Sequence, residues 1–293
     1  MRIVRLLGGL GNQMWQYAFL VALKENFPDE EVYYDASFFN GYPLHNGFEL
    51  DRIFNISAKQ ATKKDIRKVY HFFVGKYLYS RIYRHYFPIL KTEIREVEAS
   101  AFSPNVIKRN QDCYYDGYWA DYRYYNEYRD CILKEFSFKT PLDERNQVLI
   151  SKYKDFVLCS LHVRRGDYLK DPDFSGICDE EYYERAILRS KSEMGNKRIA
   201  YLVFSNDTRW CKSHLNDKFG DSSVEYVDWN TGHNSYKDMH LMSLCQINII
   251  ANSSFSWWGA YLNQIPNRIV IAPQKYKNKE MGFNIWLNDW LNV

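Results

Sequence analysis

The feature that most restricts the fold of this 293-residue sequence is an alternation of strands and helices that occurs in two separate series. In the first series, the apolar segment 2–7 is typical of a buried strand, the apolar face of 13–27 is typical of a helix, and 31–35 is typical of a second strand. The second series predicts elements at 156–163 (strand), 180–192 (helix), 198–205 (strand), 208–219 (helix), 223–228 (strand), 235–245 (helix), 247–251 (strand) and 268–272 (strand). Strands and helices that alternate in this way form parallel sheets covered on both faces, so we expect an α/β fold.

The two series indicate two domains, which we place at 1–150 and 151–293, with the joint at 140–155. Between the series, the stretch 59–95 carries ten Lys and Arg residues, two acidic residues and eight aromatic residues. We expect one or two helices there. They either form a solvated face over core aromatics or contact a membrane surface at the inner face of the cell membrane.

Composition and charge exclude several classes of protein. Lys and Arg number 39 against 36 Asp and Glu, and the resulting net charge of +3 argues against a protein that coats nucleic acid. No run approaches the ~18 apolar residues of a membrane span, and the chain opens without a signal-peptide pattern. The six cysteines lack C-x-x-C spacing, which favours free thiols in a reducing compartment. We therefore expect a cytoplasmic protein.

A glycine turn at 8–11 follows the first strand and opens the first helix. It matches part of the dinucleotide-binding pattern G-x-G-x-x-G, but Met14 stands where the third glycine belongs. Asp35 follows at about the distance at which such a site places its ribose-binding acid. Two other interpretations stay open. The glycines form only a tight turn, or the turn contacts a substrate through the amides of Asn12 and Gln13 at the helix start.

The segment 157–168 ends a hydrophobic strand with Arg164, Arg165 and a glycine turn. Ligands bind at the carboxyl ends of strands in open α/β sheets, and a guanidinium fork holds phosphate oxygens through two hydrogen bonds. The pattern therefore indicates a diphosphate site. The alternative is a structural ion pair between one of the arginines and Asp167.

Residues 252–260 read NSSFSWWGA and directly follow the apolar run 247–251. Hydroxyl and amide groups at the end of a strand that leads into a helix suit a pocket for an oxygen-rich ligand. In the alternative interpretation, Ser253 and Ser254 only cap the helix and the two tryptophans belong to the core.

Four such segments occur in one order: Gly-Gly-Leu-Gly-Asn-Gln at 8–13, His-Val-Arg-Arg-Gly-Asp-Tyr at 162–168, Phe-Ser-Asn-Asp at 204–207 and Asn-Ser-Ser-Phe-Ser-Trp-Trp-Gly-Ala at 252–260. Together they resemble the motifs of glycosyltransferase family 11, the α-1,2-fucosyltransferases. The second segment is also similar to the signature of α-1,6-fucosyltransferases. The chain departs from the family pattern at 117–120, where Gly-Tyr-Trp-Ala stands in place of Gly-Tyr-aromatic-Gln.

The resemblance implies a GT-B type fold, with two Rossmann-like halves facing a central cleft. It implies an inverting α-1,2-fucosyltransferase with GDP-fucose as donor, a galactose-terminated glycan as acceptor and no cofactor. Arg164 would hold the β-phosphate as electrophilic catalyst, which makes a metal unnecessary, and His162 would contact the nucleotide. Arg165 and Asp167 would fix the loop, and His162 and Asp167 are the candidates for a catalytic base. Further donor contacts are implied at Gly9, Gly11, Asn12, Gln13, Asn206, Asp207, Asp238 (guanine), Ser253, Ser254, Phe255 and Ser256.

Other functions stay as alternatives. Asp171 and Asp173 have the D-x-D spacing of metal-dependent glycosyltransferases, a fucosyltransferase could form another linkage, and the glycine turn leaves a nicotinamide-dependent oxidoreductase open. A non-catalytic glycan-binding protein would use the aromatic residues, which make up 17% of the chain, and a nucleic-acid binder would use the basic and aromatic stretch 59–95. Many of them crowd into 114–128, and tyrosine-rich walls suit a sugar, so we expect the acceptor there.

Overall fold

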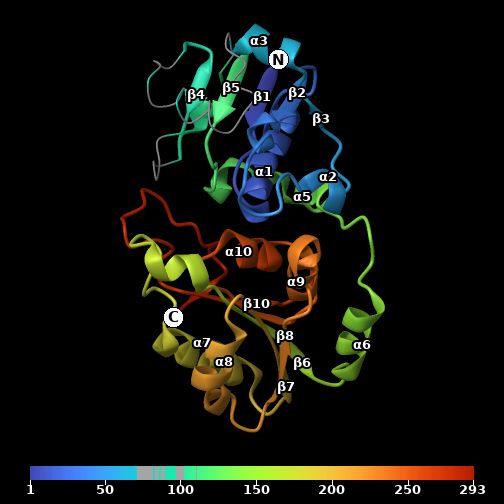
Figure 1. The fold of residues 1–293 in the computed structure, drawn as a ribbon, viewed down its shortest axis with the longest axis vertical. Helices are drawn as coiled ribbons and strands as arrows, with labels where there is room; N and C mark the ends of the chain where they lie inside the picture. Colours follow the sequence, from blue (N-terminus) through green and yellow to red (C-terminus); the bar gives the residue numbers. More distant parts are fainter. Residues whose placement is uncertain (71–81, 83–85, 87–89, 97–101, 110) are drawn as a thin grey trace. The chain divides into compact units, whose positions relative to one another are not determined.

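The computed structural model describes residues 1–70, 82, 86, 90–96, 102–109 and 111–293. It divides the chain into two compact units (Figure 1). Unit 1 consists of Met1–Lys139 with Met281–Ile285, and unit 2 consists of Thr140–Glu280 with Trp286–Val293.

The division falls before helix α6 (Glu144–Lys152), whereas we expected it at 150/151 inside this helix. The buried Asn146 explains why α6 belongs to unit 2. Its Oδ1 accepts from Trp229 Nε1 at 3.0 Å, and its Nδ2 donates to Asn230 Oδ1 at 3.0 Å. Both partners lie in unit 2, so these bonds hold the helix there.

Unit 1 contains a five-stranded parallel sheet in the order β3-β2-β1-β5-β4. Its strands are β1 (Arg2–Arg5), β2 (Val32–Asp35), β3 (Lys59–Gln60), β4 (Glu93–Arg95) and β5 (Cys113–Asp116). Its α-helices in the described part are α1 (Leu10–Asn26), α2 (Leu50–Ile53), α3 (Lys63–Val69) and α5 (Arg129–Glu135). The strand–turn–helix–strand unit predicted at the start of the chain is confirmed.

Charged residues form a row along the carboxyl edge of this sheet. Asp35, Arg5, Asp116 and Arg95 end four neighbouring strands, and the register places them side by side in that order. Arg5 Nη1 lies 3.0 Å from Asp116 Oδ2, and the Tyr114 hydroxyl donates to Asp35 at 2.7 Å. Burial alone would lower the pKa of the Arg5 guanidinium, but neighbouring acidic groups, with the Asp116 carboxylate as the largest contributor, more than offset this effect and raise the pKa. The Arg5 guanidinium therefore stays charged inside the unit.

The aromatic residues of 114–128 pack mainly in the core of unit 1, so most of these rings are not accessible to the acceptor that we expected there. Tyr115, Trp119 and Tyr124 contact Phe19 of α1, a helix that is buried from Gln13 to Leu23, whereas Tyr114 stacks on Tyr70. Phe19 of α1 stacks on Trp119 with ring centroids 4.4 Å apart. The buried rings of the segment are Tyr114, Tyr115, Trp119, Tyr124 and Tyr125.

Unit 2 contains a six-stranded parallel sheet in the order β11-β10-β9-β6-β7-β8. Its strands are β6 (Val157–Val163), β7 (Ile199–Ser205), β8 (Ser223–Val227), β9 (Ile247–Ile249), β10 (Ile269–Ala272) and β11 (Leu291–Asn292). Its α-helices are α6, α7 (Glu180–Met194), α8 (Thr208–Leu215), α9 (Tyr236–Met242) and α10 (Ser254–Tyr261). The elements predicted for the second series all form, with small shifts at their ends.

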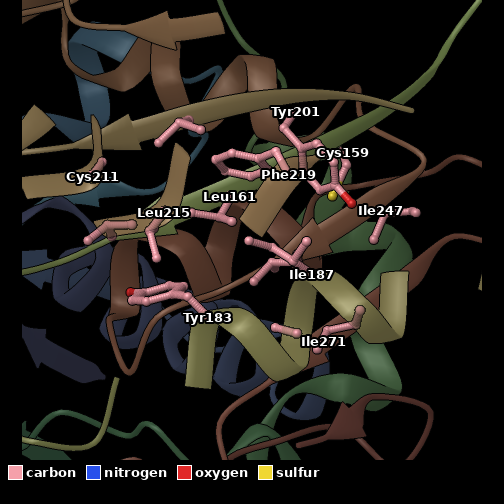
Figure 2. Close-up of a cluster of buried hydrophobic side chains, with 14 of the residues drawn as sticks. Cys159, Leu161, Tyr183, Ile187, Tyr201, Cys211, Leu215, Phe219, Ile247 and Ile271 are labelled. Carbon is pink, nitrogen blue, oxygen red and sulfur yellow. The ribbon is translucent and has the colours of Figure 1, made fainter. Parts of the chain in front are cut away.

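Both faces of the unit 2 sheet are covered by helices. Successive strand residues point to opposite faces, so neighbours on one strand pack into different clusters. Tyr201 belongs to a buried cluster with Ile187 of α7 (Figure 2). Its neighbour Leu202 belongs to a second cluster, with Leu241 of α9. The continuous apolar strands of the sequence are thus explained by burial on two sides.

The basic stretch 59–95 is described in part. It contains α3, which begins with a capping box in which Thr62 and Asp65 exchange hydrogen bonds. The expected further helix and the expected membrane contact fall mostly on 71–89, of which only residues 82 and 86 are described. In the described part of the chain, no helix is both long and apolar enough to span a bilayer. All six cysteines are free thiols, as their spacing predicted.

We predict that Asp116→Ala lowers the free energy of unfolding by about 3–5 kcal/mol, because it removes the carboxylate that forms an ion pair with the buried Arg5 guanidinium. Urea denaturation followed by circular dichroism measures the change. Arg189→Ala is the control, because it removes an ion pair with Glu193 from the surface of α7 and should cost less than about 1 kcal/mol. Equal losses in the two variants would contradict this view of the buried pair.

Candidate functional site

The candidate site of unit 2 lies where the order of its strands reverses. β6 and β9 are neighbours, but the chain continues from β6 to β7 on one side and from β9 to β10 on the other. The segments that follow these strands therefore diverge at the carboxyl edge, where ligands bind in sheets of this kind. These segments are 164–170, here called the arginine turn, and 250–254, which leads into α10.

Arg165 is fixed by contacts within the protein. Its backbone N–H donates to Asn206 Oδ1 at 2.9 Å, its Nε donates to Asp207 Oδ2 at 3.2 Å, and its guanidinium carbon lies 4.1 Å from the ring centre of Trp210. Gly166 has φ +50°, and a Cβ there would come within 2.4 Å of Asn206 Nδ2. Asn206 and Asp207, which we expected to contact the donor, therefore hold the arginine turn in place.

Arg164 is less constrained than Arg165. Its Nη2 lies 2.6 Å from Asp167 Oδ1, and the two side chains are 29% and 61% exposed. An ion pair this exposed contributes about 0–1 kcal/mol, whereas a guanidinium on a phosphate makes two charge-assisted hydrogen bonds. The observed pair with Asp167 is therefore compatible with a diphosphate that takes its place.

His162 lies in β6, two residues before Arg164, and is buried. Its Nδ1 has no hydrogen-bond partner among the described residues, and its ring centre lies 5.8 Å from that of Phe255. Burial, followed by the charge of Arg164, lowers the pKa of the imidazole to about 3. The ring is therefore neutral near pH 7. This state suits a hydrogen bond to a ligand and makes the ring a weak base.

The segment 252–260 exposes only some of its polar groups to a ligand. Ser253 is the N-cap of α10, and its hydroxyl accepts from Phe255 N at 3.4 Å. Ser256 is fully buried and donates to the carbonyls of Ala251 and Ser253 at 3.4 Å. Ser254 and Phe255 are half-buried, so they are the members of the expected set that a ligand can reach.

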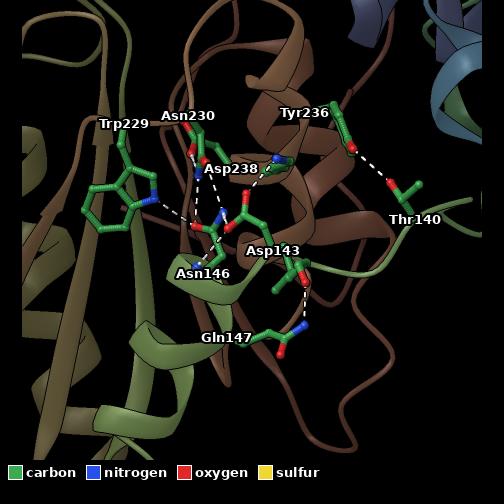
Figure 3. A network of polar contacts seen from close by, with 10 residues as sticks. Thr140, Asp143, Asn146, Gln147, Trp229, Asn230, Tyr236 and Asp238 are labelled. Carbon is green, nitrogen blue, oxygen red and sulfur yellow. Dashed lines mark hydrogen bonds and ion pairs between the residues drawn. The ribbon is translucent and has the colours of Figure 1, made fainter.

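Asp238 belongs to a polar network that links α6 to α9 (Figure 3). Asn230 Nδ2 donates to Asp238 Oδ1 at 2.8 Å, and Asn230 also bonds to Asn146 of α6. Burial raises the pKa of the Asp238 carboxyl to about 7, and the hydrogen bond from Asn230 opposes this shift. Asp238 lies in α9, which follows β8 in the chain. Its carboxyl group therefore lies in a segment that follows a strand, and it changes protonation near pH 7.

In unit 1 the strand order reverses between β1 and β5, and the glycine turn follows β1. Gly8 has φ +80°, Gly9 is the N-cap of α1, and Gly11 is buried in the first turn of the helix. Asn12 is half-buried, and a Cβ on Gly8 would come within 2.8 Å of its Nδ2. The conformation at Gly8 and its closeness to Asn12 explain why glycine occupies this position.

A dinucleotide site at this turn would need Asp35 to be accessible to the ribose of the ligand. Asp35 is buried, and its carboxylate accepts from the Tyr114 hydroxyl at 2.7 Å and from the Ser37 N–H at 2.8 Å. Met14, at the position of the third glycine, is fully buried in α1. A carboxylate engaged in this way cannot take the ribose-binding role that the pattern requires.

Gln13, which we expected to contact the donor, is fully buried and holds a loop of unit 1. Its Nε2 donates to the Gly8 carbonyl at 3.0 Å and to the Gly47 carbonyl at 2.8 Å. Its Oε1 accepts from the Glu49 N–H at 3.0 Å. Both amide hydrogens are therefore used inside the protein.

Sequence reasoning missed Glu96, which fixes the segment 117–120. Its Oε2 accepts from the backbone N–H of Tyr118 at 2.6 Å and of Trp119 at 3.0 Å. A Cβ on Gly117 would come within 2.4 Å of Glu96 Cβ, which explains the glycine. Glu96 follows β4 and the segment follows β5, so no local spacing in the sequence connects them. The segment that lacks the family's glutamine is thus shaped by a carboxylate from another strand end.

The D-x-D pair forms a local turn, in which Asp171 Oδ1 accepts from the Asp173 N–H at 2.9 Å. Across the residues that the structure describes, no group of three or more His, Cys, Asp and Glu side chains is arranged to hold a metal ion.

Comparison with known proteins identifies one family along the whole chain. The family model described as Glycosyl transferase family 11 matches residues 1–293. An alpha-1,2-colitosyltransferase from Escherichia coli is 32% identical over 95% of this chain and 93% of its own length. Galactoside alpha-(1,2)-fucosyltransferase 2 from Mus musculus is 27% identical over 88% of this chain and 67% of its own length.

Among solved structures, NodZ alpha-1,6-fucosyltransferase from Bradyrhizobium, soaked with GDP-fucose, is similar with a TM-score of 0.52. The two chains are 13% identical, and the similarity covers 89% of this chain and 91% of the other. At this identity the likeness concerns the fold, and it confirms the expected GT-B type with its Rossmann-like parallel sheets. The match over all residues and the relative at 32% identity together show that this chain belongs to glycosyltransferase family 11 and is a glycosyltransferase.

Proposed function

We propose that this chain transfers L-fucose from GDP-fucose to the 2-hydroxyl of a galactoside acceptor, with inversion at the sugar carbon. One observation carries the proposal: Arg164 is half-exposed at the strand-order reversal of unit 2, while its neighbour Arg165 is fully engaged by the protein. Names of relatives and of solved structures support the donor and the linkage, since they include an α-(1,2)-fucosyltransferase and a fucosyltransferase soaked with GDP-fucose.

In this mechanism Arg164 stabilises the leaving group. The bond between the sugar carbon and the diphosphate oxygen breaks, its electron pair stays on GDP, and the acceptor oxygen forms the new bond while it loses its proton. A cationic fork on the β-phosphate opposes the charge that develops there, so we expect no metal requirement. His162 donates or accepts one hydrogen bond in its neutral form, and the half-buried Ser254 and Phe255 line the donor.

The proton acceptor in this scheme is Asp167 or solvent. His162 has a pKa of about 3, which is far below the range of an efficient base at neutral pH. Asp167 is exposed and lies beside Arg164, so its carboxylate becomes available when the diphosphate takes over the guanidinium. A loose reaction, in which the leaving group departs early, demands little from this base.

A second candidate donor is GDP-colitose. A relative at 32% identity is named an α-1,2-colitosyltransferase, so the same linkage is formed in the family with another sugar. Colitose lacks the 3-hydroxyl of fucose. A site that hydrogen-bonds this hydroxyl rejects the deoxy sugar strongly, whereas an apolar site discriminates only weakly.

The proposed function is tested by incubating the chain with GDP-fucose or GDP-colitose and a panel of galactosides, with and without a chelator. We expect fucose on the 2-hydroxyl of a terminal galactose, with the linkage read by NMR, and an equal rate in chelator. Product from GDP-colitose alone would assign the second donor. Loss of all product in chelator would support the metal-dependent alternative, and a new bond to another hydroxyl would reject the linkage.

We predict that Arg164→Ala lowers kcat by at least about 100-fold without changing the circular dichroism spectrum, because it removes a charge from the leaving diphosphate. Steady-state assays with saturating donor measure the loss. Arg185→Ala is the matched control, since Arg185 is another exposed arginine with an acidic partner, Glu181, on α7. An Arg164→Ala enzyme as active as this control would disprove the assigned role.

We predict that GDP binding weakens as the pH falls from about 8 to about 6, by up to tenfold per unit. Guanine offers N–H donors that a carboxylate can accept. Burial raises the pKa of the Asp238 carboxyl to about 7, so the group takes up a proton over this pH range and is no longer a carboxylate. Calorimetric titration at several pH values measures the effect. Asp238→Asn should abolish the pH dependence, whereas Asp228→Asn, which changes an exposed aspartate of the same unit, should retain it. Retention in both variants would exclude Asp238 as the guanine contact.

A further inference from the structure

A loop of unit 1 outside the four motifs carries a connected group of aromatic rings. It follows β2 and spans residues 38–48, and we call it the aromatic loop. Ring centroids lie 4.8 Å apart for Phe38 and Tyr42, and 6.1 Å apart for Tyr42 and His45. Phe39 lies 5.8 Å from Phe48 and also 5.8 Å from Tyr42. The rings therefore support one another along the whole loop.

The protein holds this loop over the glycine turn. The buried side-chain amide of Gln13 connects the two segments. It donates to the Gly47 carbonyl and accepts from the Glu49 N–H at the end of the loop, and it donates to the Gly8 carbonyl in the turn. The ring of His45 approaches the turn, because a Cβ placed on Gly9 would lie 3.4 Å from three of its atoms. The loop and the turn thus form one surface at the carboxyl edge of the sheet, where the strand order reverses.

Burial differs along the aromatic loop. Phe38 is buried and anchors the loop, Tyr42 is half-buried, and His45 is exposed. His45 also has φ +56°, a conformation that is uncommon outside glycine and costs free energy. His45 therefore lies at the surface in an unfavourable backbone conformation, and the packing of the core does not require this conformation.

The chemistry of the loop favours a neutral, oxygen-rich ligand. Residues 36–48 read ASFFNGYPLHNGF and contain no Asp, Glu, Lys or Arg. A diphosphate would need cations, which the arginine turn of unit 2 offers and this loop lacks. Flat rings suit the C–H face of a sugar, and the Tyr42 hydroxyl and His45 nitrogens suit its hydroxyl groups.

We infer that the aromatic loop binds the acceptor glycan, with Tyr42 and His45 in contact with its terminal sugar and Gln13 as a positioning residue. The inference rests on the proposed function for the choice of a galactoside. It goes further in assigning acceptor recognition to residues that lie between the first and second motifs of the family.

The test compares Tyr42→Ala and His45→Ala with the wild-type chain, using lactose as acceptor and GDP-fucose as donor. Each variant should raise the KM for lactose about tenfold, the effect of losing one central contact, and leave the KM for GDP-fucose unchanged. Tyr42→Phe should lie between wild type and Tyr42→Ala, because it keeps the ring and loses the hydroxyl. The matched control is Tyr33→Ala, since Tyr33 is a half-buried tyrosine of β2 that packs against the core cluster containing Ile66 of α3.

Saturation-transfer NMR of lactose on the full chain gives a second readout that needs no transfer. A signal that is present in the wild type and falls in Tyr42→Ala and His45→Ala, but not in Tyr33→Ala, supports the loop even if no sugar is transferred. In that case only the proposed function fails. An unchanged KM and an unchanged NMR signal in both loop variants, with their circular dichroism spectra intact, would overturn the inference. One other combination would also overturn the inference: the wild type transfers fucose to lactose but gives no lactose NMR signal, and the KM for lactose is the same in the variants.

Discussion

Parallel strand pairing is the constraint on which the chemistry of this protein depends. Every pairing between strands in the described residues is parallel. All strands of a unit therefore end at one edge of its sheet, and segments far apart in the chain meet there. In unit 2 this brings the arginine turn after β6 to Asn206 and Asp207 after β7. In unit 1 it brings the glycine turn after β1 to the aromatic loop after β2.

The arginine turn shows how adjacent residues of one type take different roles. Arg165 is surrounded by Asn206, Asp207 and Trp210, and its charge is satisfied within the protein. Among the described residues, the charged partner of Arg164 is the exposed carboxylate of Asp167. Successive residues at a strand end point in different directions, so one arginine can pack against α8 while the other stays accessible. The fixed arginine then sets the position of the accessible one, and Gly166 provides the conformation that the turn needs.

Burial changes the meaning of residues that look functional in the sequence. Gln13 and Ser256 belong to motifs and are fully buried, one holding a loop and the other bonded to carbonyls near its helix start. Tyr115, Trp119 and Tyr124 pack against Phe19 of α1, and the rings that we propose for the acceptor lie in a shorter loop outside the four motifs. The fold class could be predicted from apolar periodicity, because burial on two faces imposes that periodicity directly. The role of each motif residue could not, because it depends on neighbours from other strands.

The sequence by itself determined the two series of alternating strands and helices, the order of four motifs, and the arginine pair at the end of β6. These features are local, and periodicity and spacing record them. Only the tertiary structure decided that the chain divides before α6, that Glu96 shapes the segment 117–120, and that Gln13 supports the aromatic loop. These outcomes depend on which strand ends lie side by side. Strand order and the burial that follows from it are properties of the packed sheet, and no local spacing in the chain encodes them.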